Sequence, residues 1–423
     1  MVGGLGLGLV LAGNIGRAAD LPEPVLPAGV GVNIHFTRGH GRELDLLAAA
    51  GFKFVRMDFS WAGTERQRGR YDWSAYDALT HDLEARGLRA LYILDYSNPL
   101  YERTIVRRDP VSHRERRDVA SPQTPASVEA FARWAAAAVY HFRGRHIIWE
   151  IWNEPNIHFW KPKPDVRQYI ALAKATCDKI RMVVPQATIV APASSGFPWS
   201  FFETFFKSGI LEQLDAVTVH PYRAYSQGPE TAGADYARLR ALIRRYAPVG
   251  KKTLPVLSGE WGYATHTHGV SLDTQAAFVA RQQLANLLHG VPLSIWYDWR
   301  NDGRDPNEGE HNFGVVDADM KPKPAYVAVK TLTRELNGFR VRGRINTERA
   351  EDYLLRLGDR RGLVKLAVWT TGNPHTIVLD RKQCGGRITH AVNGFGKPLT
   401  IQQQTDRVHL PLRAVPSYLT VKQ

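Results

Sequence analysis

The sequence predicts a (β/α)8 barrel, the TIM-barrel fold of the α/β class, followed by a small C-terminal β-sandwich. Short apolar runs alternate with longer amphipathic stretches from Val30 to about Leu336, as expected when helices connect parallel strands. Eight such pairs in roughly 300 residues match a closed barrel, whereas a doubly wound open sheet usually has fewer. The first apolar run is also not followed by the Gly-x-Gly-x-x-Gly turn of a dinucleotide-binding sheet.

The strand candidates are nearly continuous apolar runs, because both faces of a barrel strand are buried. In chain order they are Val30 to Phe36, Phe54 to Trp61, Arg89 to Tyr96, Ile147 to Asn153, Thr188 to Ala193, Ala216 to Tyr222, Leu254 to Glu260 and Leu293 to Trp299. Helical patterns between and after them include Arg42 to Ala50, Trp73 to Arg86, Pro125 to Phe142, Asp165 to Val184, Asp235 to Tyr246, Asp273 to Leu288 and Pro324 to Leu336. We expect these helices to form an outer layer around the strands.

After Asn337-Gly338 the rhythm changes to short alternating segments, which are typical of antiparallel strands. They are Tyr353 to Leu357, Leu363 to Thr370, His375 to Leu379, Thr400 to Gln403 and Ser417 to Val421. Gly372-Asn373 and Asn393-Gly394 are turn sequences. The sequence therefore predicts a barrel over residues 28–337 and a β-sandwich accessory domain over residues 338–423.

The first residues of the sequence resemble an export signal. Met1 to Leu11 is an uncharged Gly/Leu/Val stretch, and Gly16-Arg17-Ala18-Ala19 spaces small residues as at a signal-peptidase site. The stretch is shorter than the roughly 20 apolar residues that span a bilayer, and it has no basic region before it. We expect residues 1–18 to be a signal peptide, either whole or truncated at its start, and the protein to be periplasmic or extracellular; a disordered leader is the alternative.

The chain is basic, with 55 Lys and Arg against 41 Asp and Glu and a net charge of +14. It has no zinc-finger spacing, RNP-like aromatic pattern or long basic run, so no nucleic-acid partner is expected. An anionic polysaccharide or peripheral contact with an acidic membrane surface is compatible with this charge. Cys177 and Cys384 are the only cysteines, which excludes a disulfide framework but does not determine the compartment. The oligomeric state is not predicted.

A tryptophan-rich segment, Trp149-Glu150-Ile151-Trp152-Asn153-Glu154-Pro155-Asn156, completes the fourth strand candidate. It begins as a strand and ends in polar residues where a βα loop should start. Glu154 is therefore expected at the C-terminal mouth of the barrel, where enzymes of this fold carry out their chemistry. Pro155 marks the end of the strand, because proline cannot donate a ladder hydrogen bond.

A second carboxylate occupies the same kind of position three βα units later, in Ser258-Gly259-Glu260-Trp261-Gly262. Glu260 would face Glu154 across the barrel mouth. Glycosidic cleavage with retention of configuration uses two carboxyl groups about 5 to 5.5 Å apart, one as acid/base and the other as nucleophile. The acid needs a raised pKa and the nucleophile a lower one, and Arg56 at the end of the second strand is placed to enforce this difference.

With both glutamates in these contexts, the sequence resembles clan A glycoside hydrolases, specifically the family 39-like bacterial enzymes. In that clan, Asn-Glu-Pro at the end of strand four supplies the acid/base, and the glutamate that ends strand seven is the nucleophile. The resemblance extends over the whole barrel and, more weakly, to bacterial endoglycosidases that cut exopolysaccharides. Its further motifs are Val55-Arg56 with Trp61, Glu65, Gly69 and Tyr71-Asp72-Trp73, then His220-Pro221-Tyr222, Trp296-Tyr297-Asp298-Trp299 and Lys323-Pro324-Ala325-Tyr326.

The resemblance implies a role for each matching residue around the two glutamates. Asn153 would hydrogen-bond the sugar 2-hydroxyl, and Arg56 and Tyr222 would support the nucleophile, Glu260. Glu150 is interpreted as a structural carboxylate that points into the barrel or a helix interface.

Three further side chains are implied to bind the sugar. Trp296 would form the floor of the subsite that holds the cleaved sugar, and His35 and His220 would line the same pocket. Alternatively, these residues have only a structural role, because the barrel interior also needs aromatic side chains. At the end of the third strand, three residues form either a further subsite or ordinary loop structure, and the sequence favours neither. They are Asp95, Tyr96 and Asn98.

No metal and no cofactor are expected, since double displacement by two carboxylates needs neither. His266 and His268 follow Glu260 closely, but no third ligand accompanies them in the sequence. The acidic loop after the eighth strand lacks the EF-hand spacing, so we interpret it as solvated or substrate-facing. Its members are Asp298, Asp302, Asp305 and Glu308.

The predicted function is that of a retaining glycoside hydrolase that cleaves β-glycosidic bonds in a polysaccharide or oligosaccharide, endo-acting on an exopolysaccharide. An exo-acting β-xylosidase is the main alternative, since the sequence does not distinguish a closed pocket from an open groove. A transglycosylase would share the same covalent intermediate. A non-catalytic glycan-binding protein of a polysaccharide export system is less well supported, because both catalytic glutamates are present.

Overall fold

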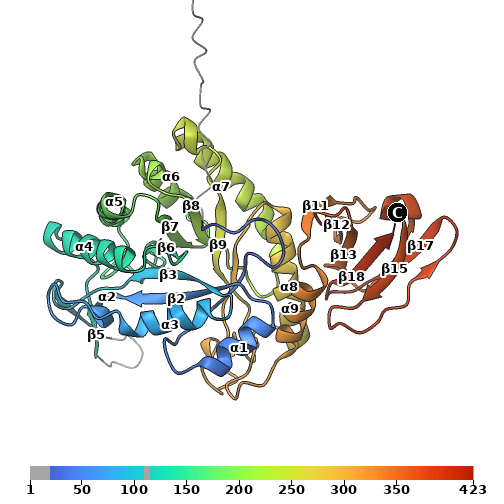
Figure 1. The fold of residues 1–423 in the computed structure, drawn as a ribbon, viewed down its shortest axis with the longest axis horizontal. Coiled ribbons are helices and arrows are strands. Elements are labelled where there is room, and N and C mark those ends of the chain that lie inside the picture. Colours follow the sequence, from blue (N-terminus) through green and yellow to red (C-terminus); the bar gives the residue numbers. More distant parts are fainter. Residues whose placement is uncertain (1–19, 109–114, 423) are drawn as a thin grey trace, which may run out of the picture.

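Eight parallel strands close into a barrel in the order β1-β10-β9-β8-β7-β6-β3-β2, so the first and last strands are neighbours. The computed structural model describes residues 20–108 and 115–422. Helices pack around the outside of the strands (Figure 1). The predicted barrel is therefore confirmed, whereas the predicted signal peptide, residues 1–18, lies outside the described residues.

Each barrel strand is followed along the chain by a helix of the outer layer. The strands are β1 (Val30–Asn33), β2 (Phe54–Ser60), β3 (Arg89–Asp95), β6 (Ile148–Ile151), β7 (Thr188–Ser195), β8 (Ala216–His220), β9 (Val256–Trp261) and β10 (Ser294–Trp296). The helices are α1 (Gly41–Ala49), α3 (Ser74–Glu84), α4 (Pro125–His141), α5 (Val166–Val183), α6 (Trp199–Lys207), α7 (Gly233–Tyr246), α8 (Leu272–Leu288) and α9 (Pro324–Glu335). Most strands end earlier than predicted, because their last residues leave the hydrogen-bonded ladder and enter βα loops.

The sequence patterns did not predict two features of the barrel. One is helix α6, whose nine residues are too few for a strong periodic signal. The other is a hairpin of β4 (Thr104–Arg108) and β5 (Glu115–Val119), which lies in the connection after β3. The hairpin strands are rich in charged residues and lack an apolar alternation, so they did not resemble strands.

Polar N-cap residues define where several helices begin. Thr124 Oγ1 accepts a hydrogen bond of 3.1 Å from the backbone N–H of Ser127, in a capping box at the start of α4. Asp165 Oδ1 accepts two backbone N–H bonds, of 2.9 and 3.1 Å, from the first turn of α5. Ser271 caps α8 in the same way. These oxygens satisfy N–H groups that the first helical turn leaves without a partner.

The barrel interior is apolar at one end and polar at the other. The apolar layer consists of Leu21, Phe54, Leu91, Ile93, Ile148, Val190, Ala216, Leu257, Leu293 and Ile295. Side chains two residues apart on a strand face the same side. Arg56 therefore follows Phe54 into the interior, and Glu150 follows Ile148; both side chains are no more than 1% exposed. This alternation places charged groups above the apolar layer, at the C-terminal ends of the strands.

Two antiparallel sheets follow the barrel, beside α8 and α9 (Figure 1). The larger has the order β11-β12-β13-β18-β15 and the smaller β14-β17-β16. Leu354 and Val368 of the larger sheet share an apolar core with Leu379 and Leu410 of the smaller one. Their elements are β11 (Arg340–Arg344), β12 (Asp352–Gly358), β13 (Val364–Thr370), β14 (His375–Asp380), α10 (Arg381–Cys384), β15 (Arg387–Val392), β16 (Gln402–Gln403), β17 (Arg407–Leu412) and β18 (Ser417–Lys422).

The predicted fold class, a barrel followed by antiparallel β-structure, is thus confirmed. The domain limits at residues 28–337 and 338–423 stay predictions. Strands β11, β15 and β17 were not predicted from the sequence. In the part of the chain that the structure describes, no helix is long and apolar enough to cross a bilayer. Cys177 and Cys384 are both free and buried.

A buried ion pair of the barrel accepts a hydrogen bond from the larger sheet. Arg281 of α8 donates from Nε and Nη2 to the two carboxylate oxygens of Glu230, each at 2.7 Å. Trp369 of β13 donates from Nε1 to Glu230 Oε1 at 2.8 Å. All three residues are at most 9% exposed, so this contact is a buried polar link between the barrel and the sheet.

We predict that Trp369→Phe lowers the free energy of unfolding by about 1.5 to 3 kcal/mol, the usual contribution of a hydrogen bond to a charged group. The substitution keeps a ring that can stack on Tyr353, whose centroid lies 4.9 Å away, but leaves Glu230 with one donor fewer. Urea unfolding followed by circular dichroism would measure the change. Trp73→Phe, at a half-buried tryptophan of the barrel, is the control; an equal effect of both substitutions would contradict the role of this hydrogen bond.

Candidate active site

Arg56 is the centre of a buried polar network at the C-terminal end of the barrel. Its guanidinium group has five N–H donors, and acceptors lie at all of them. Nε donates to Glu150 Oε2 at 2.7 Å, and Nη1 donates to Glu260 Oε2 at 2.6 Å. The remaining acceptors are Asn33 Oδ1 at 3.2 Å, Asn153 Oδ1 at 2.8 Å and His220 Nε2 at 3.3 Å. The sequence-predicted residues Arg56, Asn153, His220 and Glu260 are therefore brought together.

Glu260 lies near the end of β9, and both of its oxygens accept a hydrogen bond. The Tyr222 hydroxyl donates to Oε1 at 2.8 Å, and Arg56 donates to Oε2. The side chain is 14% exposed, so one edge of the carboxylate remains open to the barrel mouth. Gly262 allows the chain after Glu260 to pack closely against β10, because a Cβ there would lie 1.8 Å from the Tyr297 carbonyl oxygen.

Glu154 lies in the turn after β6, in a backbone conformation that is uncommon for a non-glycine residue. Its φ is 46°, and Trp152 and Ala193 nearby also have positive φ values of 65° and 52°. Such conformations cost about 1 to 3 kcal/mol each and are concentrated at functional sites. The Glu154 N–H donates to the Ala193 carbonyl at 3.0 Å, which ties the turn to β7. The side chain is thereby held over the barrel mouth.

Burial controls the protonation of Glu154 and its neighbour His220. Glu154 is 6% exposed, and burial raises its pKa to about 7. His220 is fully buried, and burial lowers its pKa to about 4, so its imidazole is neutral near neutral pH. Nε2 accepts from Arg56, which has only donors, so Nδ1 must carry the hydrogen. His220 Nδ1 then donates to Glu154 Oε1 at 2.9 Å.

The two glutamates are close enough to act on one atom. One carboxylate oxygen of Glu154, one of Glu260 and a ring nitrogen of His220 all lie within 4.8 Å of one another. Retaining glycosidases hold their carboxyl groups about 5 to 5.5 Å apart, whereas inverting enzymes need about 6.5 to 9.5 Å to admit a water molecule. The geometry of this pair therefore fits attack on an anomeric carbon followed by hydrolysis of a covalent intermediate.

Asn153 connects Arg56 to an aromatic side chain of the third strand. Its Oδ1 accepts from Arg56, and its Nδ2 donates to the Tyr96 hydroxyl at 2.8 Å. Of the subsite considered at the end of β3, only Tyr96 joins this network. Asn98 is 1% exposed and bonds to backbone groups of Glu65 and Leu100, and Asp95 is fully buried. The Asp95 pKa is raised by burial and by the nearby carboxylate of Asp58.

Trp296 does not lie where the sequence led us to expect it. Its ring is 0% exposed and packs against Tyr263, so it offers no face to a sugar. Leu293 and Ile295 face the barrel interior, so the alternation of β10 turns Trp296 outward and Tyr297 toward the barrel mouth. Tyr297 is half-buried, and the carboxylates of Asp298 and Glu260 add to burial in raising its pKa.

His35 lies at the rim of the site and outside the hydrogen bonds of Arg56. Its side chain is 41% exposed, and its ring packs edge-on against Tyr297 with centroids 5.7 Å apart. Sequence reasoning gave Tyr297 no role, although counting alternate residues along the strand would have placed it inside the barrel. Glu150, interpreted from the sequence as a structural carboxylate, is buried beside Arg56. The roles implied for His35 and the other sugar-binding residues stay predictions.

The remaining candidates lie away from the paired glutamates. His266 and His268 are neighbours, with ring centroids 6.4 Å apart, but His266 packs against Tyr225 instead of joining a ligand cluster among the described residues. Asp305 Oδ1 accepts the backbone N–H of Asn307 within its own loop. The motif residues Trp61 and Glu65 are structural, since the indole N–H donates to Glu65 Oε2 at 2.6 Å.

Comparisons with known proteins agree with this architecture. Residues 31–302, more than half of the chain, match the family model described as Cellulase (glycosyl hydrolase family 5). A β-xylosidase from Caldicellulosiruptor saccharolyticus is 24% identical over 234 residues, which cover 51% of this chain and 46% of that protein. The chain thus aligns with less than half the length of this curated relative.

Two solved structures show the same fold over nearly the whole chain. A family 39 glycoside hydrolase from Bacteroides cellulosilyticus WH2 is 24% identical, with a TM-score of 0.80, and covers 94% of this chain and 81% of its own. A family 39 β-xylosidase from Caulobacter crescentus is 19% identical, with a TM-score of 0.66, and covers 96% of this chain and 97% of its own. The family match shows that the chain belongs to the Cellulase (glycosyl hydrolase family 5) family of clan A glycoside hydrolases, and the two solved structures show that its fold is similar to that of family 39 enzymes.

Proposed function

We propose that this glycoside hydrolase cleaves β-glycosidic bonds in a polysaccharide or oligosaccharide, with Glu154 as the acid/base and Glu260 as the nucleophile. The observation that carries the proposal is the approach of the two carboxylates to within 4.8 Å in unlike environments. Glu154 is buried with a pKa of about 7, so it retains a proton near neutral pH. The Glu260 carboxylate is held by the Arg56 guanidinium and the Tyr222 hydroxyl.

In the first step, a Glu260 oxygen attacks the anomeric carbon while the bond from that carbon to the leaving oxygen breaks. Glu154 transfers its proton to the leaving oxygen, so the departing sugar leaves as a neutral alcohol. The Nδ1–H of His220 donates to Glu154 Oε1, so the acidic proton resides on Oε2. The product of this step is a glycosyl ester of Glu260.

In the second step, the Glu154 carboxylate removes a proton from a water molecule, and the water oxygen attacks the anomeric carbon. The bond to Glu260 breaks, and its carboxylate is restored between Arg56 and Tyr222. Two inversions at one carbon give net retention. Asn153 is oriented by Arg56 and Tyr96 toward the sugar hydroxyl next to the reacting carbon.

The raised pKa of Glu154 predicts an alkaline limb in the pH profile. The acid must be protonated, so kcat/KM should fall as pH rises through the Glu154 pKa of about 7. A glycoside whose leaving group needs no proton, such as a 2,4-dinitrophenyl glycoside, should lack this limb. Initial rates with both substrate types between pH 5 and about 9 would measure it; the same limb for both substrates would contradict Glu154 as the acid.

For the substrate, we propose an exopolysaccharide that is cut internally. The net charge of +14 supports an anionic polymer, because a basic protein attracts acidic chains. Exo-acting β-xylosidase activity is the second candidate, supported by the β-xylosidases of Caldicellulosiruptor saccharolyticus and Caulobacter crescentus. Viscosity and product size separate the two: internal cutting lowers viscosity before reducing ends accumulate, whereas an exo-acting enzyme releases monosaccharide at nearly constant viscosity.

We also propose that the protein is exported to the periplasm or the medium. The support is the apolar stretch and the small residues before position 19 of the sequence. Expression of the full chain in a Gram-negative host, followed by fractionation and N-terminal sequencing, tests it. Export predicts a mature N-terminus directly after residue 18, whereas an intact N-terminus in the cytoplasmic fraction would contradict it.

A further inference from the structure

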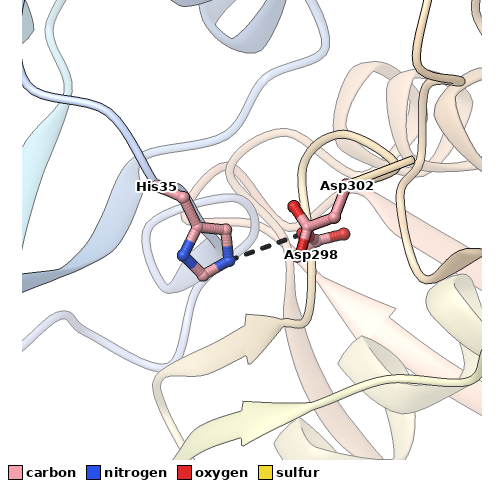
Figure 2. Close-up of side chains that lie close together, drawn as sticks. All are labelled: His35, Asp298 and Asp302. Carbon is pink, nitrogen blue, oxygen red and sulfur yellow. Dashed lines mark ion pairs between the residues drawn. The ribbon is translucent and has the colours of Figure 1, made fainter. Parts of the chain in front are cut away.

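We propose that His35, Asp298 and Asp302 form a binding site for a divalent first-row transition-metal ion, such as Mn2+ or Zn2+, at the seam of the barrel. One imidazole nitrogen and one oxygen from each carboxylate lie within 4.8 Å of one another. Figure 2 shows the His35 ring pointing toward the two carboxylates, with the ion pair to Asp298 marked by a dashed line. The proposal concerns a site outside the paired glutamates and does not depend on the proposed function.

The barrel closure brings these residues together from opposite ends of the domain. His35 follows β1 and Asp298 follows β10, and these two strands pair in parallel with Val32 opposite Trp296. Beyond the paired residues, the Trp299 N–H donates to the Asn33 carbonyl at 3.0 Å, which extends the contact between the strand ends. The carboxylates and the imidazole therefore project from two backbones that the barrel already holds side by side.

Asp298 supplies an independent indication of an incomplete site. Its side chain is 1% exposed, yet neither oxygen accepts a hydrogen bond from any described residue. His35 Nε2 lies 3.6 Å from Oδ2, which is too long for a hydrogen bond. A buried carboxylate without a hydrogen-bond partner is unfavourable, and in native structures buried charges are usually paired or bind an ion.

The nearest lysine does not fulfil this role. Lys323 is buried near Asp298, but its ammonium group donates to Thr265 Oγ1 at 3.1 Å, Asn312 O at 3.3 Å and Asn301 Oδ1 at 3.4 Å. These three acceptors use the three donors of an ammonium group. Asp298 is therefore left facing His35 and Asp302.

The set of donor atoms favours a particular class of ion. Imidazole suits first-row transition metals, and carboxylates are accepted by manganese and zinc, whereas calcium prefers oxygen ligands alone. Zinc sites of three protein ligands commonly keep a further position for water or substrate. Because His35 packs against Tyr297 at the mouth, an ion here would also fix the rim of the sugar cleft.

The described residues contain a second cluster of possible metal ligands, at the glutamate pair, but we do not propose a metal there. Glu154, His220 and Glu260 also bring ligand atoms within 4.8 Å of one another. There, however, Arg56 already supplies a buried positive charge, and both nitrogens of His220 have partners. At Asp298, by contrast, neither carboxylate oxygen accepts a hydrogen bond from a described residue.

Isothermal titration calorimetry with chelator-treated protein tests the proposal, using MnCl2, ZnCl2 and CaCl2 as separate titrants. Wild type is expected to bind one Mn2+ or Zn2+ per chain, more tightly than Ca2+, with a rise in melting temperature. His35→Ala and Asp302→Ala each remove one ligand at an exposed position, so both should fold and bind at least about tenfold more weakly. Asp298→Asn should lose binding as well.

Asp305→Asn is the matched control, because it removes the same charge from an exposed residue of the same loop outside the cluster. It should bind the metal as wild type does. Glu154→Gln should also bind normally, which separates this site from the catalytic proposal. Absence of binding in wild type, or equal affinity in wild type, His35→Ala and Asp302→Ala, would overturn the proposal.

Discussion

Glu260→Gln should lower kcat/KM by at least about 10,000-fold, the scale of loss when a nucleophile is removed from a catalytic unit. The amide has nearly the same shape, and its oxygen can still accept from Arg56 or Tyr222, so the fold should be preserved. It cannot, however, form a glycosyl ester that water can hydrolyse. Rates with an activated aryl β-glycoside, together with the melting temperature of the variant, would measure both effects.

Glu154→Gln should behave differently with the same reagents. With a poor leaving group, we expect a loss of about 100- to 10,000-fold, the usual contribution of general acid catalysis. With a dinitrophenyl leaving group the first step needs no acid, so the glycosyl-enzyme should form quickly and accumulate. A burst of dinitrophenol, and a sugar adduct on the peptide that contains Glu260, would identify the nucleophile by mass spectrometry.

Sodium azide distinguishes the two roles by stereochemistry. In Glu154→Ala, azide should attack the glycosyl-enzyme and give a β-glycosyl azide. In Glu260→Ala, azide should enter from the side of the missing carboxylate and give the α-anomer. Glu310→Gln, a change of an exposed carboxylate at the barrel mouth, is the control and should cost no more than a few-fold. The same anomer from both alanine variants, or an adduct on another residue, would reject the assignment of roles.

The barrel and its two glutamates could be predicted because both depend on local patterns. Apolar runs and helical periodicity identify the βα units, and a parallel barrel puts the C-terminal ends of all its strands at one face. Glu154 and Glu260 were therefore expected at the same mouth without any knowledge of distances. The structure adds what local patterns do not contain, namely the five acceptors around Arg56 and the tautomer of His220.

The sequence did not predict the orientation or neighbours of several individual side chains. Trp296 was expected in the sugar site because the family resemblance implied it, although Leu293 and Ile295 already define the inward face and place Tyr297 there. The proximity of His35 to Asp298 could not be predicted from spacing, because it depends on closure of the barrel between its first and last strands. In the C-terminal sheets, strands such as β11 and β15 have many charged residues and a weak alternation.

Arg56→Met is expected to have the largest effect on stability, about 3 to 5 kcal/mol, as when one partner of a buried ion pair is removed. Arg56 is 1% exposed and satisfies Glu150, which is fully buried inside the barrel. Methionine fills part of the volume but leaves the Glu150 carboxylate without a positive partner. Urea unfolding would show the loss as a lower midpoint at unchanged slope.

The matched control is Arg145→Met, which breaks an ion pair of the same type at the surface. Arg145 donates to both oxygens of Glu84 at 2.7 and 2.6 Å, and the two side chains are 40% and 41% exposed. Solvent screens such pairs, so we expect a change of about 0 to 1 kcal/mol. A loss in Arg56→Met no larger than this would contradict the role of Arg56 as the central partner of the network.

A double variant identifies which carboxylate depends on Arg56 for stability. Glu150→Gln removes the buried negative charge but keeps the shape of the side chain, so Arg56→Met with Glu150→Gln should be more stable than Arg56→Met alone. Its activity should nevertheless stay low and should not recover with azide, because Glu260 and Asn153 still lack the guanidinium that positions them. Stability would thus depend on the contact of Arg56 with Glu150, whereas activity would depend on its contact with Glu260. If the double variant recovered both stability and activity, Arg56 would only support folding.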